Sequence, residues 1–78
     1  MDLVQLETEA RGDVVIAHVN GELDLAGAPS TGEAIGEAVP TSARALVVDF
    51  TKLEFIDSSG IAMLFNLVRR LGGRRQQM

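Results

Sequence analysis

The sequence contains no cysteine, which excludes disulfide bonds and thiolate metal sites. It also lacks an apolar run long enough to span a bilayer and a basic-then-apolar N-terminal signal segment. Lys and Arg total 7 against 11 Asp and Glu, and the resulting net charge of −4 does not favour binding to the phosphates of nucleic acids. With a single histidine, no metal site is predicted. We therefore expect a cytoplasmic protein that contacts neither nucleic acid nor membrane and carries no cofactor.

The chain of 78 residues is long enough for one small domain. A domain of this size buries only roughly 60% of the surface of its unfolded chain, so its stability should be modest. An apolar content of 46% is typical of a globular protein rather than a disordered one. We expect the domain to occupy residues 1–73 and a polar tail to occupy residues 74–78.

The pattern of apolar residues predicts an α/β domain with the order β-β-α-β-α. Strands are expected over 3–8 and 14–19, where they form a hairpin, and over 45–50. A first helix is expected over 29–39, and a second runs from 59 to about 71. The middle strand, the first helix and the third strand form a βαβ unit with parallel strands, so the sheet is mixed and has about three strands.

The two expected helices differ in strength. The first contains Gly32 and Gly36, which each cost roughly 1 kcal/mol relative to alanine in a helix interior, so it should depend on docking against the sheet. The second is more apolar than a single buried face requires. Four of its residues recur at helical spacing and are expected to face the sheet: Ile61, Leu64, Val68 and Leu71. Ala62, Met63 and Phe65 then lie on other faces, available to the first helix or to a partner.

A serine-containing turn joins the third strand to the second helix. Asp57 and Ser58 stand where helix N-caps are found, because a short side-chain oxygen can accept an unpaired backbone N–H there. A helix N-terminus also tolerates added negative charge. Ser58 can therefore be read either as a cap or as a residue that carries a phosphate without unfolding its helix.

Three segments in this order resemble the STAS domain of bacterial anti-anti-sigma factors: Gly21-Glu22-Leu23-Asp24, Leu46-Val47-Val48-Asp49-Phe50 and Phe55-Ile56-Asp57-Ser58-Ser59-Gly60-Ile61. The order and spacing match along nearly the whole chain. The domain of that family normally continues with another strand, helix, strand and helix, whereas this sequence stops at Met78. The resemblance thus implies a STAS-like fold that lacks the family's C-terminal strand–helix units.

The resemblance implies an anti-sigma factor antagonist. Such a protein binds an anti-sigma factor, which is also its serine kinase, and is released when it is phosphorylated; a serine phosphatase then reverses the modification. By position in the motif, Ser58 rather than Ser59 matches the phosphate acceptor. The expected partner-binding residues are Asp24, Asp57, Ser58, Ser59, Gly60 and Met63. Asp24 can alternatively cap the first helix, and Asp57 the second.

The sequence raises two alternative functions. A serine between a strand and a helix is also typical of hydrolases, but their Gly-x-Ser-x-Gly sequence is absent here, and His18 inside a strand and Lys52 are the available bases. We therefore do not expect an enzyme. The second alternative keeps the STAS fold without the switch, as a scaffold module of a stress-sensing or lipid-transport complex.

The predicted sheet has an unpaired edge. Without a following strand, the third strand has an unpaired side, and such an edge invites pairing with another chain. We therefore predict self-association, domain swapping or low stability.

Overall fold

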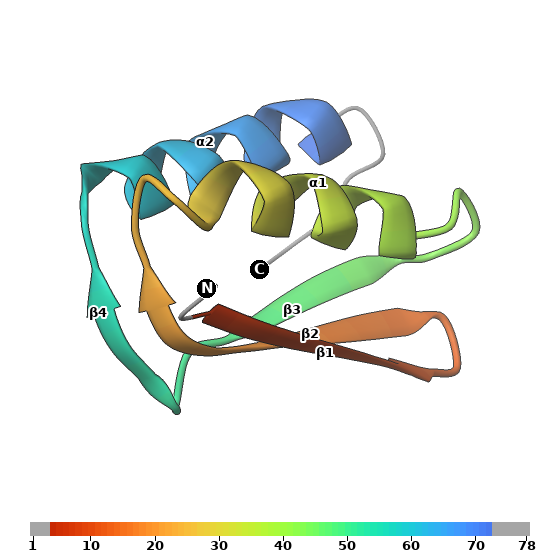
Figure 1. The fold of residues 1–78 in the computed structure, drawn as a ribbon. Helices are drawn as coiled ribbons and strands as arrows, with labels where there is room; N and C mark the ends of the chain where they lie inside the picture. The colour runs from red at the N-terminus through yellow and green to blue at the C-terminus, as the bar shows by residue number, and fades with distance from the viewer. Residues whose placement is uncertain (1–3, 73–78) are drawn as a thin grey trace.

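The first two strands form an antiparallel hairpin in the computed structural model, which describes residues 4–72 (Figure 1). β1 (Val4–Arg11) pairs with β2 (Val14–Leu23) along its whole length. Alternate residues of β2 are buried, namely Val15, Ala17 and Val19, because only one face of the sheet is covered. The predicted hairpin is confirmed, although both strands extend beyond the expected ranges.

Two further strands pair in parallel with β2 on the side opposite β1. β3 (Ala45–Asp49) lies beside residues 14–18, and β4 (Leu53–Ile56) lies beside residues 21–23. Within residues 4–72 the sheet therefore contains four strands, and the mixed α/β fold that the sequence predicted is confirmed. β4 was not predicted, because its four residues stand between a turn and a helix cap and are too short to show a period.

Both helices cover the same face of the sheet (Figure 1). α1 (Ala28–Ala38) and α2 (Ser58–Gly72) run side by side above the strands. The buried apolar residues between the helices and the sheet form the core: Val15, Ala17, Val19, Leu23, Ala28, Ile35, Val39, Ala43, Leu46, Met63, Leu67 and Leu71. Among the helices within residues 4–72, none is long and apolar enough to cross a bilayer.

The buried face of α2 differs from the predicted one. Met63, Leu67 and Leu71 are at most 5% exposed, whereas Ile61 and Val68 are each 48% exposed. The prediction that Ile61 and Val68 face the sheet was therefore wrong. α2 packs against α1 as well as against the strands, so its buried face is turned toward α1.

Two glycines of α1 permit this close packing of the helices. A Cβ atom on Gly32 would lie 2.5 Å from Cγ of Met63, and one on Gly36 would lie 2.5 Å from Nη1 of Arg70. Both glycines are buried. Residues that weaken α1 as an isolated helix thus allow α2 to approach it, which explains their presence.

Within the described part of the chain, one open edge of the sheet is β1, and the other is formed by β3 and β4. These three strands each pair with β2 alone. The predicted tail, 74–78, lies outside the described residues.

Candidate functional site

The two motifs of the sequence meet at one end of the sheet, where β2 and β4 finish and both helices begin. Leu23 of β2 is in register with Ile56 of β4, so Asp24 and Asp57, the next residues of each strand, leave the sheet at the same edge. The backbone N–H of Asp57 donates to the carbonyl of Leu23 at 3.3 Å. Segments more than thirty residues apart in the sequence therefore form one surface.

Asp57 is the cap of α2. Its Oδ1 accepts the backbone N–H of Ser59 at 2.8 Å and that of Gly60 at 3.3 Å. These are two of the N–H groups that a helix leaves unpaired in its first turn. Of the two possible caps in the sequence, Asp57 therefore fills the role, and Ser58 does not.

Ser58 is the first residue of α2, and its side chain is exposed. Among residues 4–72, its hydroxyl has no hydrogen-bond partner. The first turn of α2 contains no acidic residue, while Arg69 and Arg70 occupy the last turn. The hydroxyl thus stands free at the positive end of the helix dipole, where an added anion is favoured.

Asp24 organises the turn that leads into α1. Its Oδ1 accepts the N–H of Ala26 at 3.1 Å and that of Gly27 at 3.4 Å, and its carbonyl accepts the N–H of Ala28 at 2.8 Å. The N-cap position of α1 is Gly27, which makes no side-chain cap hydrogen bond. Asp24 therefore precedes the helix instead of capping it, and it leaves the sheet at the same edge as the serine turn, with a half-buried side chain.

Of the other three predicted partner-binding residues, two are buried. Gly60 is buried, and a Cβ atom there would lie 2.9 Å from the carbonyl oxygen of Leu23. Met63 is 5% exposed and packs beside Gly32. Ser59 is half-buried. The open part of the site is therefore formed by Asp24, Ser58 and Ser59, while Gly60 and Met63 hold the helix in place.

A groove of about 520 Å³ runs between α1 and α2 from Ser59. Apolar side chains form most of it, with Glu33 and Arg70 on opposite helices; the lining residues are Leu25, Pro29, Gly32, Glu33, Ser59, Ala62, Met63, Asn66, Leu67 and Arg70. Leu25, next to Asp24, is 74% exposed. Sequence reasoning missed this residue, although an apolar side chain in a turn beside Asp24 was the available signal.

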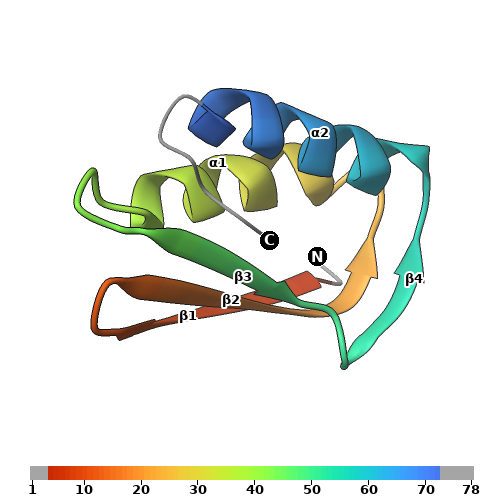
Figure 2. The ribbon, with the colours of Figure 1, turned by 180° about the vertical axis from the view of Figure 1, so that it is seen from behind.

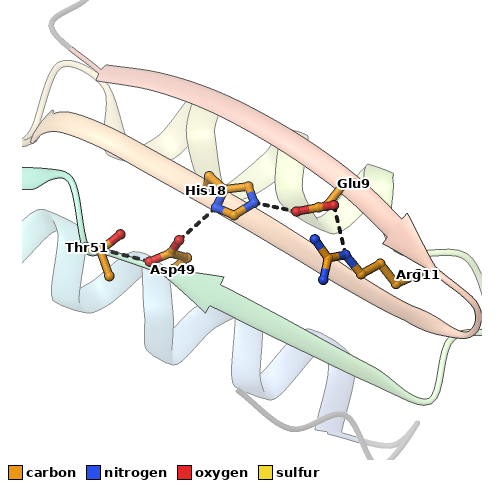
Figure 3. A network of polar contacts seen from close by, with 5 residues as sticks. All are labelled: Glu9, Arg11, His18, Asp49 and Thr51. Carbon is orange, nitrogen blue, oxygen red and sulfur yellow. Dashed lines mark hydrogen bonds and ion pairs between the residues drawn. The ribbon is translucent and has the colours of Figure 1, made fainter.

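His18 lies in a separate network on the uncovered face of the sheet (Figure 3). Its Nε2 is 2.8 Å from Glu9 and its Nδ1 is 2.8 Å from Asp49. Two hydrogen bonds raise the pKa of His18: the one to Glu9 has the larger effect, and the one to Asp49 adds to it. The backbone N–H of Thr51 is the main cause that lowers the pKa of Asp49 to about 2. The histidine thus links three strands, as expected of a structural residue, and is engaged away from Ser58.

Comparison with known proteins identifies the family of the chain. The STAS domain model matches residues 5–78. The anti-sigma-F factor antagonist RsfB of Mycobacterium tuberculosis is 32% identical over 71 residues, which are 91% of this chain and 58% of RsfB. The chain thus spans a little over half the length of this relative.

Two solved structures are similar as well. The crystal structure of an anti-sigma factor antagonist from Mycobacterium paratuberculosis superposes with a TM-score of 0.82 at 33% identity, covering 94% of this chain and 62% of that one. The structure of the anti-sigma factor antagonist SpoIIAA in its unphosphorylated form gives a TM-score of 0.67 at 26% identity, and the match covers 90% of this chain and 64% of that one. These relatives are named as regulators rather than enzymes.

Proposed function

The chain belongs to the STAS domain family, and from this premise we propose that it is an anti-sigma factor antagonist switched by phosphorylation of Ser58. In its unphosphorylated form it binds an anti-sigma factor that is also a serine kinase, and so regulates sigma-dependent transcription. One observation carries the proposal: the Ser58 hydroxyl is exposed and unpaired among residues 4–72, on a helix already capped by Asp57.

The proposed reaction requires only a hydroxyl from this chain. The kinase transfers the γ-phosphoryl group of ATP to Oγ of Ser58, takes up the hydroxyl proton and leaves ADP. No base contacts the Ser58 hydroxyl within residues 4–72, and the chain's one histidine is held by Glu9 and Asp49. Ser58 therefore acts as an acceptor and not as the nucleophile of an enzyme.

The phosphate would act on the complex and leave the fold intact. It adds roughly −1.5 to −2 charges at pH 7, and the N-terminus of α2 offsets part of that charge. The open site already holds the carboxylates of Asp24 and Asp57, in a chain of net charge −4. A partner that packs over Ser58 would have to bury an unpaired dianion, which costs several kcal/mol at an interface.

The test is intact mass spectrometry of the chain incubated with ATP and an anti-sigma factor that is also a serine kinase. We expect one added phosphate, lost in Ser58→Ala and retained in Ser59→Ala. Ser59 is the matched control because it adjoins Ser58 but its side chain is half-buried. Unphosphorylated Ser58→Ala should still bind the kinase, because neither the cap nor the groove is changed.

The opposite pattern would refute the assignment. A phosphate that persists in Ser58→Ala, or one that disappears in Ser59→Ala, places the acceptor elsewhere. If an active kinase adds no phosphate to a chain that circular dichroism shows to be folded, the domain is a scaffold module and not a switch.

A further inference from the structure

His18 lies between two carboxylates on the face of the sheet that the helices leave uncovered (Figure 3). Its Nε2 is 2.8 Å from Oε1 of Glu9 on β1, and its Nδ1 is 2.8 Å from Oδ2 of Asp49 on β3. An ionised carboxylate only accepts hydrogen bonds, and a neutral imidazole has a single N–H to donate. Both contacts are hydrogen bonds only when the ring carries two protons. The geometry is therefore that of an imidazolium joined to two strands.

The charges around the ring favour this state. On the two long neighbours of β2, the charged residues of the same face are Glu7, Glu9 and Arg11 of β1 and Asp49 of β3. Three of these four are acidic, and the cation, Arg11, is 72% exposed and pairs with Glu9 at 3.1 Å. The hydrogen bond to His18, and then that to Arg11, lowers the pKa of Glu9. The ring thus titrates between two carboxylates that are already ionised.

The two carboxylates differ in how firmly they are held. Oδ1 of Asp49 accepts the backbone N–H of Thr51 at 2.9 Å, which keeps Oδ2 directed at Nδ1 of the ring. The side chain of Glu9 is longer and 39% exposed, and its second oxygen contacts the exposed side chain of Arg11 instead of a backbone group. A ring nitrogen without its proton repels the carboxylate that faces it. Glu9 can turn into solvent in response, whereas Asp49 is fixed by the backbone.

We propose that Glu9, His18 and Asp49 form a pH-dependent clamp across β1, β2 and β3. The imidazolium closes the clamp by donating to both carboxylates. When the pH rises, the proton on Nε2 passes to solvent, the proton on Nδ1 remains with Asp49, and Glu9 moves away from the ring. The clamp therefore opens on the side of β1 alone. This inference concerns the face of the sheet opposite the helices and does not depend on the proposed function.

The first test observes the ring protons in the whole, unmodified chain. Two-dimensional NMR that correlates the carbon-bound ring protons with Nδ1 and Nε2 distinguishes the imidazolium from the two neutral tautomers, and the chain has a single histidine. We expect two protonated nitrogens at about pH 5 and, at about pH 10, a neutral ring with its proton on Nδ1. A neutral ring with its proton on Nε2, or one that exchanges between the two forms, would overturn the proposal.

The second test removes one carboxylate at a time and measures the midpoint of the same titration. Glu9→Gln and Asp49→Asn should each lower the midpoint, because an uncharged amide replaces a carboxylate that binds the imidazolium. Glu7→Gln is the matched control, since Glu7 pairs with His18 in the strand register while both ring nitrogens are bonded elsewhere. It should lower the midpoint less than either variant. An equal decrease in all three would show that the general negative charge, and not the clamp, holds the second proton.

The same two variants test the asymmetry of the clamp. In Asp49→Asn, the amide oxygen keeps the N–H of Thr51 and the amide NH2 group faces Nδ1, so Nδ1 must accept. The proton of the neutral ring should then move to Nε2, toward Glu9. In Glu9→Gln, it should remain on Nδ1. The same tautomer in both variants would show that Asp49 does not select the proton, and would refute the release of Glu9.

Discussion

Replacement of the two α1 glycines by alanine should change stability in opposite directions. Alanine is favoured over glycine in a helix interior by about 1 kcal/mol, partly because it restricts the unfolded chain. This gain is the same at both positions. The two variants differ in the atom of α2 that the new methyl group meets. The difference between their stabilities therefore measures the effect of packing between the helices.

At Gly32 the new Cβ would lie 2.5 Å from Cγ and 3.4 Å from the sulfur of Met63. Met63 is 5% exposed, and its Cγ is held in mid-chain, so the helices must separate or Met63 must change rotamer. Overpacking of this kind costs about 1–3 kcal/mol. The net expectation for Gly32→Ala is a loss of about 1 kcal/mol.

At Gly36 the three atoms nearest to the new Cβ all belong to the guanidinium of Arg70, with Nη1 at 2.5 Å and Cζ at 2.7 Å. Arg70 is exposed, so the end of its side chain can move into solvent at little cost. The helix-propensity gain then remains, and Gly36→Ala should stabilise the domain by about 0.5–1 kcal/mol.

Thermal melts followed by circular dichroism at 222 nm measure both changes, because the chain has no tryptophan or tyrosine to report by fluorescence. For a domain of this size, 1 kcal/mol shifts Tm by about 4–8 °C. All samples should share one concentration, since association changes the apparent stability. Equal stabilisation by both variants would refute the argument that Met63 requires a glycine opposite it.

Three further predictions concern the site and the sheet. Asp57→Ala should lower the free energy of unfolding in urea denaturation by about 0.5–2 kcal/mol, because it removes the cap of α2. Ser58→Ala should change the same free energy by less than about 0.5 kcal/mol. Equal losses in the two variants would show that both residues cap the helix. Gly60→Ala should lower Tm strongly, since its Cβ would lie 2.9 Å from the rigid carbonyl of Leu23, and an unchanged Tm would refute the close contact. His18 has a raised pKa, so its contribution to stability should be complete below about pH 6.5 and be lost as the pH rises through the folded-state value. Melts of the chain and of His18→Gln between pH 5 and 9 should therefore converge at high pH, and parallel curves would contradict this.

The hairpin and the βαβ unit could be predicted from the sequence because each strand leaves its own local pattern. In β1, the apolar Val4 and Leu6 alternate with polar residues, so a period of two is visible, and β2 begins with a continuous apolar run over 14–17. β4 leaves no such pattern, since four residues contain too little periodicity and Phe55, one of them, is 51% exposed. The existence of this strand depends on its pairing with residues 21–23, a contact that no local pattern records.

The serine turn leads into the second helix as predicted, but it follows β4 and not the third strand, and the roles within it could not be separated from the sequence. Asp57 and Ser58 both carry an oxygen that can cap a helix, and only the hydrogen bonds to Ser59 and Gly60 distinguish them. The buried face of α2 was misjudged for a similar reason. Spacing along one helix does not tell which of its apolar faces meets the sheet and which meets α1.

The division of roles between neighbouring residues at the start of α2 has a consequence for the lifetime of the protein. Proteolysis in cells acts on the unfolded fraction, so a modification that alters stability also alters abundance. Asp57 holds the helix, and the hydroxyl of Ser58 holds nothing within the described chain. A change at Ser58 can therefore alter which surface a partner meets while the rate of degradation stays the same. Under the proposed switch, the ratio of phosphorylated to unphosphorylated chains would then report the activity of the kinase and phosphatase alone.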